Sequence, residues 1–162
     1  YFSGFESLFD MIKKKSKPNG QILWFVQPTE IYNLSEKPFQ ILLWEEPVSP
    51  KPIRRKYREF LDLIAWYVLG DDYTFNKLLW NLMNSRFNDI IIRDQRFHKW
   101  EKPESLIEKF VKIHSNEGDL ILDPFLGCGT TAVVCKRLNR NFIGCDIDVD
   151  CIEISNRRLK EL

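Results

Sequence analysis

The stretch DLILDPFLGCGTTA, residues 119–132, decides the fold of this chain. Residues 119–122 have the composition of a short buried strand, and a turn with two glycines, Gly127 and Gly129, follows. Glycine has no Cβ atom, so the backbone of such a turn can approach a ligand closely. Residues 131–138 then predict a helix that begins at this turn. Strand, glycine turn and helix in this order are typical of the nucleotide-binding βαβ unit.

The residues after this helix complete the unit. Residues 141–145 predict a second strand, which is followed by an acid, Asp146. An acid at this place in nucleotide-binding units accepts hydrogen bonds from ribose hydroxyls. A last helix follows, and residues 150–153, DCIE, are a candidate capping box at its start.

The ligand class depends on Asp123, because residues 127–132 also fit the dinucleotide pattern G-x-G-x-x-A. A carboxylate at the strand's exit would repel the pyrophosphate that a helix N-terminus attracts. The same carboxylate favours a cationic ligand. S-adenosylmethionine carries an ammonium and a sulfonium group, and its ribose suits Asp146. The residues by themselves favour this cofactor modestly and leave a nicotinamide dinucleotide open.

The rest of the chain alternates helical and strand periods. This alternation predicts an α/β, Rossmann-like fold with a mostly parallel sheet and helices on both faces. Continuous apolar runs, such as residues 21–26, are typical of strands in parallel sheets. The expected helices are residues 5–12, 29–36 and 104–114, and the expected strands are residues 21–26, 39–44 and 61–68.

Composition excludes several classes of protein. The 162 residues suit one domain, and the formal net charge of +1 excludes a strongly basic or strongly acidic chain. Hydrophobic residues make up 44% of the sequence, enough for a packed core. No apolar run reaches the roughly 18–20 residues that span a bilayer. Because Glu6 and Asp10 do not fit a secretory signal, we expect a cytoplasmic protein.

The cysteines predict neither a metal site nor disulfides. The chain has two histidines and no C-x-x-C pair, so the usual zinc-ligand spacing is missing. We expect reduced thiols in the core. The four cysteines are Cys128, Cys135, Cys145 and Cys151.

A proline-rich segment, residues 45–58, predicts an exposed loop. Its second half contains Tyr57 and several basic residues. Such a loop is either a solvated connection or a surface that grips phosphates and stacks on a base, and the sequence leaves both open. The basic residues are Lys51, Arg54, Arg55, Lys56 and Arg58.

Two motifs resemble those of a known family. Residues 123–131, DPFLGCGTT, and residues 142–148, FIGCDID, resemble the cofactor motif of DNA amino-methyltransferases, which methylate adenine N6 or cytosine N4. Residues 98–103, HKWEKP, resemble the family's H-P-x-Q-K-P motif and depart from it at Lys99 and Glu101. The resemblance implies an S-adenosylmethionine site formed by Asp123, Pro124, Phe125, Gly127, Gly129, Thr130, Thr131, Asp146, Ile147 and Lys102.

The order of the motifs resembles the permuted β class of this family, in which the catalytic half comes first. It implies a single methyltransferase domain with a catalytic half at residues 1–70 and a cofactor half at residues 98–162. Residues 71–97 would be a short target-recognition insert. Because the insert is short, we expect that the protein recognises its DNA sequence weakly or over very few base pairs, with the basic loop supplying much of the affinity for DNA.

The family's catalytic motif is (D/N/S)-P-P-(Y/F), and it precedes a helix like that of residues 5–12. Tyr1 would be its last letter and Phe2 the next residue, while the acid and both prolines are not in the 162 residues. In the family, the polar side chain and a carbonyl accept hydrogen bonds from the amine, and the aromatic ring stacks on the flipped base. Three explanations stay open: an N-terminus upstream of Tyr1, a shortened protein without turnover, or completion by another subunit.

The resemblance therefore predicts an enzyme that methylates DNA with S-adenosylmethionine, with adenine N6 favoured over cytosine N4. It implies a role in DNA methylation, such as restriction–modification, and allows a homodimer. The main alternative is a catalytically incomplete accessory protein that binds the cofactor and nucleic acid. A nucleotide-dependent oxidoreductase is the third hypothesis, which Asp123 disfavours.

Overall fold

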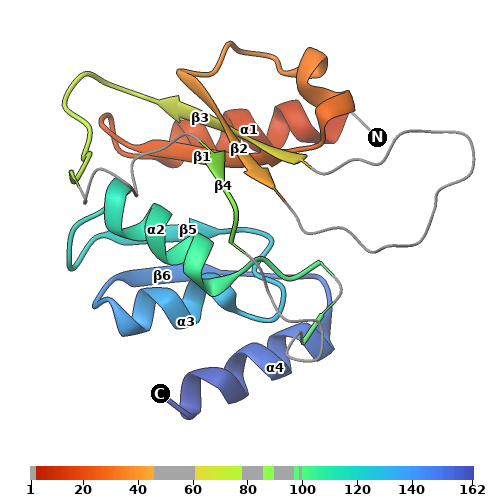
Figure 1. Ribbon diagram of the computed structural model, residues 1–162, viewed down its shortest axis with the longest axis vertical. Helices are drawn as coiled ribbons and strands as arrows, with labels where there is room; N and C mark the ends of the chain where they lie inside the picture. Colours follow the sequence, from red (N-terminus) through yellow and green to blue (C-terminus); the bar gives the residue numbers. More distant parts are fainter. Residues whose placement is uncertain (1–2, 46–60, 78–85, 90–96, 99) are drawn as a thin grey trace, which may run out of the picture. The chain divides into compact units, whose positions relative to one another are not determined.

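The computed structural model describes residues 3–45, 61–77, 86–89, 97–98 and 100–162. The chain forms two compact units, drawn in Figure 1. The first unit consists of Tyr1–Tyr73 and Asn84–Asn88, and the second of Thr74–Met83 and Asp89–Leu162. Each unit has its own sheet.

The first unit contains a four-stranded sheet in the order β1-β3-β2-β4. Strand β3 pairs antiparallel with both β1 and β2, whereas β2 and β4 are parallel. The short strand β4 comes from a stretch for which the sequence predicted no element. The strands are β1 (Gln21–Val26), β2 (Gln40–Glu45), β3 (Leu61–Val68) and β4 (Arg86–Phe87).

The predicted mostly parallel sheet is therefore confirmed only in part, because both pairings of β3, with β1 and with β2, are antiparallel. Ile64, Ala65, Trp66 and Tyr67 are all buried in β3. Because successive side chains point to opposite faces, both faces of this central strand are covered. A strand covered on both faces has a continuous apolar run whichever way it pairs, so the pattern could not give the direction.

Helix α1 (Ser3–Lys15) covers one face of this sheet. The ring of Phe9 packs among Ile22, Val26 and Ala65, with its centroid 4.7 Å from that of Tyr67. The helix predicted over residues 29–36 is a 3₁₀ helix, η1 (Pro28–Asn33). Proline at its first position fits a helix start.

The second unit contains the strand–turn–helix pattern that the sequence predicted. Strands β5 (Leu120–Asp123) and β6 (Asn141–Gly144) are parallel. Helix α3 (Thr130–Arg137) connects them and packs against β6, α2 (Glu104–His114) and α4 (Val149–Lys160). Where α2 and α3 pack, the core of this second unit includes the buried side chains of Leu106, Ile107, Phe110, Val111, Ala132, Val133, Val134 and Cys135.

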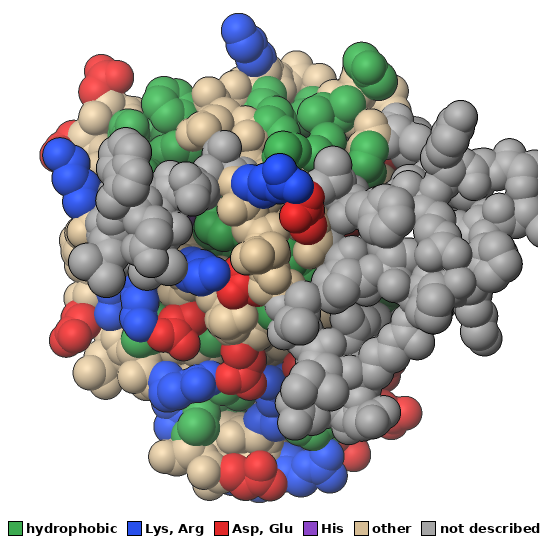
Figure 2. Space-filling model, in the orientation of Figure 1, with side chains coloured by type: hydrophobic (Ala, Val, Ile, Leu, Met, Phe, Trp, Pro, Cys, Tyr) green, Lys and Arg blue, Asp and Glu red, His purple; other side chains and the backbone are tan. Residues whose placement is uncertain are grey.

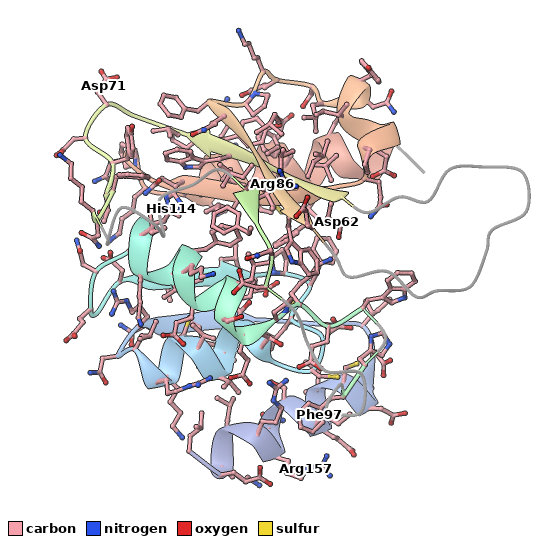
Figure 3. The ribbon with its side chains drawn as sticks, viewed as in Figure 1. Asp62, Asp71, Arg86, Phe97, His114 and Arg157 are labelled. Carbon is pink, nitrogen blue, oxygen red and sulfur yellow. The ribbon has the colours of Figure 1, made fainter. Side chains whose placement is uncertain are left out.

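The last residue of α2 is a histidine in apolar surroundings. Figure 3 labels His114 at the end of this helix. Its ring centroid lies 5.8 Å from that of Phe75 and 6.4 Å from that of Phe110. Burial disfavours the charged imidazolium and lowers the pKa of His114 to about 4.

Surface charge is mixed. On the face drawn in Figure 2, Lys and Arg side chains lie beside Asp and Glu side chains. This agrees with ion pairs such as Lys13–Glu36 in the first unit and Lys109–Asp89 in the second. Among the helices of the described ranges, none combines the length and apolarity needed to cross a membrane.

Candidate functional site

The exits of β5 and β6 lie side by side and form the base of the candidate site. Asp123 is the register partner of Gly144, and the Cys145 N–H donates to the Asp123 carbonyl over 3.2 Å. The Leu126 N–H donates to the Cys145 carbonyl over 2.9 Å. Because parallel strands end at the same sheet edge, Asp123 at the end of β5 and Asp146 just after β6 lie at one edge of this sheet.

The Asp123 carboxylate holds the turn that follows β5. Its Oδ1 accepts the N–H of Phe125 over 3.0 Å, and its Oδ2 accepts the hydroxyl of Thr131 over 2.6 Å. One side chain thus fixes the start of the turn and the first turn of α3. Each carboxylate oxygen retains a further lone pair for a ligand.

The Asp146 carboxylate links the glycine turn to α4. Its Oδ2 accepts the N–H of Gly127 over 2.7 Å, and its Oδ1 accepts the N–H of Asp148 over 2.9 Å. Asp148 in turn caps α4 by accepting the N–H of Asp150 over 3.0 Å. The capping box predicted at residues 150–153 was therefore wrong: the cap lies two residues earlier.

The two glycines of the turn are required for different reasons. Both have positive φ, +53° at Gly127 and +87° at Gly129. A Cβ atom on Gly127 would meet nothing within 4 Å, so the backbone there faces open space. A Cβ atom on Gly129 would lie 2.2 Å from Oγ of Ser155 on α4. Gly127 therefore leaves room for a ligand, and Gly129 lets α4 pack against the turn.

Residues from the H-P-x-Q-K-P-like segment reach the same turn. Glu101 Oε1 accepts the hydroxyl of Thr130 over 3.2 Å and Nη1 of Arg158 over 2.9 Å. Lys102 follows Glu101 immediately and is half-buried. Glu101, to which the sequence analysis gave no role, thus bonds the first residue of α3, and the predicted cofactor residue Lys102 is its neighbour in the chain.

Apolar side chains beside the acids are exposed. Phe125 is 64% exposed and Ile147 is fully exposed. An exposed aromatic ring and an exposed aliphatic side chain next to two carboxylates provide contacts for an adenosine-like ligand with a cationic group. The N-terminus of α3 adds a partial positive charge to the same turn.

Three of the four cysteines confirm the prediction of core thiols. Cys128, Cys135 and Cys151 are buried, and Cys128 and Cys151 lie 3.4 Å apart between sulfur atoms without a disulfide. Burial raises the pKa of Cys135 to about 11, and the charge of Asp123 adds to the shift. The prediction was wrong for Cys145, which is exposed because it follows β6 at the sheet edge.

The predicted cofactor residues in β5, the turn and the residues after β6 come together in the second unit. The described residues contain no group of three or more His, Cys, Asp or Glu side chains placed to hold a metal ion. Other predicted site residues lie outside the described part of the chain: Tyr1, Phe2, Lys51, Arg54, Arg55, Lys56 and Arg58.

Sequence reasoning missed Glu101, Asp148 and Arg158. The signal for Arg158 was its helical spacing. It follows Cys151 by seven residues and Ser155 by three, which places it on the buried face of α4. A buried arginine on such a face needs carboxylate or carbonyl partners, and the glycine turn provides one of them.

Comparisons with known proteins agree with this geometry. A profile of the family N6_N4_Mtase, described as DNA methylase, matches residues 1–157. The type II methyltransferase M2.DpnII of Streptococcus pneumoniae is 30% identical over 171 residues. This match covers 93% of the chain and 64% of M2.DpnII, so the chain spans less than two thirds of that relative's length.

Solved structures show a Rossmann-like methyltransferase fold. The crystal structure of the M1.HpyAVI–SAM complex matches with a TM-score of 0.79 and 27% identity, over 94% of this chain and 82% of that one. The PvuII DNA methyltransferase, described as cytosine-N4-specific, matches with a TM-score of 0.78 and 18% identity, over 98% and 70%. This last likeness concerns the fold alone. Because the family profile spans nearly the whole chain and the site has the expected acids and glycine turn, the chain belongs to the DNA methylase family.

Proposed function

We propose that this chain binds S-adenosylmethionine and is part of an enzyme that methylates an exocyclic amine in DNA, adenine N6 or cytosine N4. One observation carries the proposal. In a chain of the DNA methylase family, Asp123 and Asp146 hold a turn whose Gly127 backbone faces open space. We expect adenine as the target base.

The residues of the turn fit the proposed cofactor. Two carboxylates beside the turn favour a ligand with ammonium and sulfonium groups over a pyrophosphate. Asp146 has lone pairs for ribose hydroxyls, and the exposed side chains of Phe125 and Ile147 supply apolar contacts for the adenine ring. When bound, S-adenosylmethionine supplies a methyl group on a positively charged sulfur.

The residues of this chain then contribute binding and orientation. We infer that Asp123 and Lys102 hold the methionine half of the cofactor, and that Asp146 holds the adenosine half. Methyl transfer is an in-line displacement, so holding the acceptor amine in line with the methyl group is the main contribution a protein can make. Tyr1 would stack on the flipped base, by the family resemblance.

The division of labour along the chain is part of the proposal. Residues 1–70 form the catalytic half, residues 71–97 the target-recognition insert and residues 98–162 the cofactor half. The basic loop of residues 45–58 would contact DNA phosphates. We also propose a homodimer and a role in restriction–modification; the relative M2.DpnII is described as a type II methyltransferase.

A second candidate is an accessory protein that binds the cofactor and nucleic acid without turnover. In such a protein, the turn held by Asp123 and Asp146 would serve binding alone.

The test is transfer of a labelled methyl group from S-adenosylmethionine to unmethylated DNA, followed by nucleoside analysis. The chain is assayed beside a form extended to the length of its curated relatives. Asp146→Asn removes one site carboxylate, and Glu153→Gln removes an exposed carboxylate on α4 as a matched control.

Label on adenine N6 or cytosine N4, lost in Asp146→Asn and retained in Glu153→Gln, is the expected result. Activity in the extended form alone would assign turnover to the added residues. Cofactor binding without transfer in either form would favour the accessory protein. Binding of a nicotinamide dinucleotide in place of S-adenosylmethionine would overturn the proposal.

A further inference from the structure

Glu101 stands where the family's H-P-x-Q-K-P motif has glutamine, and the resemblance gave this position no role. In the structure, its side chain is 6% exposed and makes three hydrogen bonds. Its Oε1 accepts Nη1 of Arg158 and the hydroxyl of Thr130, and its Oε2 accepts the N–H of Phe97 over 2.9 Å. Segment 97–101, α3 and α4 thus share one carboxylate.

Arg158 is the second half of this contact. Its side chain is 7% exposed, so its charge depends on protein partners. Besides Glu101, Nη1 donates to the carbonyl of Cys128 over 2.7 Å, and Nη2 donates to Glu104 over 2.7 Å. The guanidinium also lies 4.6 Å from the centroid of the Phe97 ring, which Figure 3 labels beside α4.

These hydrogen bonds restrict the backbone of the glycine turn. Cys128 lies between Gly127 and Gly129, and two glycines give a free turn many backbone conformations. Arg158 holds the carbonyl between them, while Glu101 holds Thr130, the first residue of α3. A turn held in its binding conformation loses less entropy when a ligand binds.

The charge of Glu101 matters for the same reason. Glu104 is the other carboxylate bonded to Arg158, and it is shared with Arg137. Removing the Glu101 charge would leave the buried guanidinium with a partly exposed and shared partner. Removing one partner of a buried ion pair leaves the other charge uncompensated, so the remaining side chain moves to a new position. Because the Arg158 guanidinium donates to the Cys128 carbonyl, that carbonyl would move with it.

We propose that Glu101 is a positioning residue: through Arg158 and Thr130 it fixes the glycine turn, and thereby sets the affinity for the cofactor. Neither Glu101 nor Arg158 needs to touch the ligand for this effect. The inference rests on the proposed binding of S-adenosylmethionine. It adds that an ion pair between segment 97–104 and α4 controls that binding.

The experiment combines cofactor titration with hydrogen exchange of the free protein. Titration calorimetry measures the Kd for S-adenosylmethionine in wild type, Glu101→Gln, Glu101→Ala, Arg158→Met and the double variant Glu101→Ala/Arg158→Met. Hydrogen exchange measures the amides of residues 126–129 without cofactor. Lys109→Met is the matched control, because it breaks an ion pair with Asp89 in the same unit.

Each single alanine or methionine variant is expected to raise the Kd about tenfold or more, as when one charge-assisted hydrogen bond is lost. The double variant should raise it by less than the product of the single effects, because the two residues act through each other. Glu101→Gln retains an acceptor and should have a smaller effect. Exchange of the turn amides should rise in the same order, with Lys109→Met unchanged in both measurements.

Two results would overturn the inference. The first is that the Glu101 variants have the same Kd for S-adenosylmethionine and the same amide exchange rates as wild type. The second is that Lys109→Met changes the Kd and the exchange rates as much as the Glu101 variants do, which would show general destabilisation. If wild type does not bind S-adenosylmethionine, the proposed function fails instead. The exchange of the turn amides then decides by itself whether Glu101 positions the turn.

Discussion

Substitution of the two turn glycines by alanine should separate folding from binding. In Gly129→Ala, the new Cβ atom would lie 2.2 Å from Oγ, 2.7 Å from Cβ and 3.0 Å from Cα of Ser155. Two of these three atoms cannot move aside by a side-chain rotation, because Cα and Cβ are fixed by α4. The substitution therefore forces the turn away from the helix.

The magnitude follows from three contributions. A non-glycine residue at a left-handed φ such as +87° costs about 1–2 kcal/mol. Overpacking of a dense interior costs a further 1–3 kcal/mol or so. Alanine restricts the unfolded chain and returns about 0.4–1 kcal/mol. Gly129→Ala should thus lower the free energy of unfolding by about 1–4.6 kcal/mol, with a middle value of about 3 kcal/mol.

The assay is urea denaturation without cofactor, with Gly127→Ala as the matched variant. Gly127 also has positive φ, but its Cβ would meet nothing within 4 Å. This variant should lose at most about 1.6 kcal/mol of stability, because backbone strain is partly offset by the restricted unfolded chain. It should still bind S-adenosylmethionine poorly, because the methyl group would occupy the open space that we assign to the ligand. Equal stability losses in the two variants would refute the packing argument for Gly129.

Other predictions concern titration, reactivity and the site acids. Folding lowers the pKa of His114 from 6.5 to about 4, so its contribution to stability is fully present above pH 6.5. As the pH falls towards 4, the free energy of unfolding should decrease by up to about 3 kcal/mol. In His114→Gln, the free energy of unfolding measured with urea should depend less on pH over this range. With iodoacetamide, Cys145 should react first in the native protein and Cys135 only after unfolding, as peptide mass mapping would show; simultaneous labelling would contradict the burial of Cys135. Asp123→Ala should abolish the thermal shift caused by S-adenosylmethionine while the chain stays folded, and a retained shift would remove Asp123 from the cofactor site.

The second unit could be predicted from the sequence because its pattern is local. The strand of residues 119–122, the glycine turn and the acid Asp146 follow one another closely, and each has a distinct composition. Their hydrogen bonds also run between near neighbours, such as Asp123 with Phe125 and Thr131. The order of strand, turn, helix and strand was therefore enough to predict that Asp123 and Asp146 lie at the same edge of the sheet.

The first unit shows what local patterns leave out. The continuous apolar run of β3 predicted a covered strand correctly, but strand direction depends on partners far along the chain. The ion pair of Glu101 with Arg158 was hidden for the same reason. Its two residues are distant in sequence, and nothing in the local pattern around either one indicates the other as its partner.

The close approach of Gly129 to Ser155 has a consequence for the evolution of the sequence. Because a Cβ atom on Gly129 would lie 3.0 Å from the Cα of Ser155, neither position can gain volume unless the two segments move apart. We therefore expect the small side chain of Ser155 to vary together with position 129 among relatives. Anyone grafting this turn into another protein would have to transplant the matching face of α4 with it.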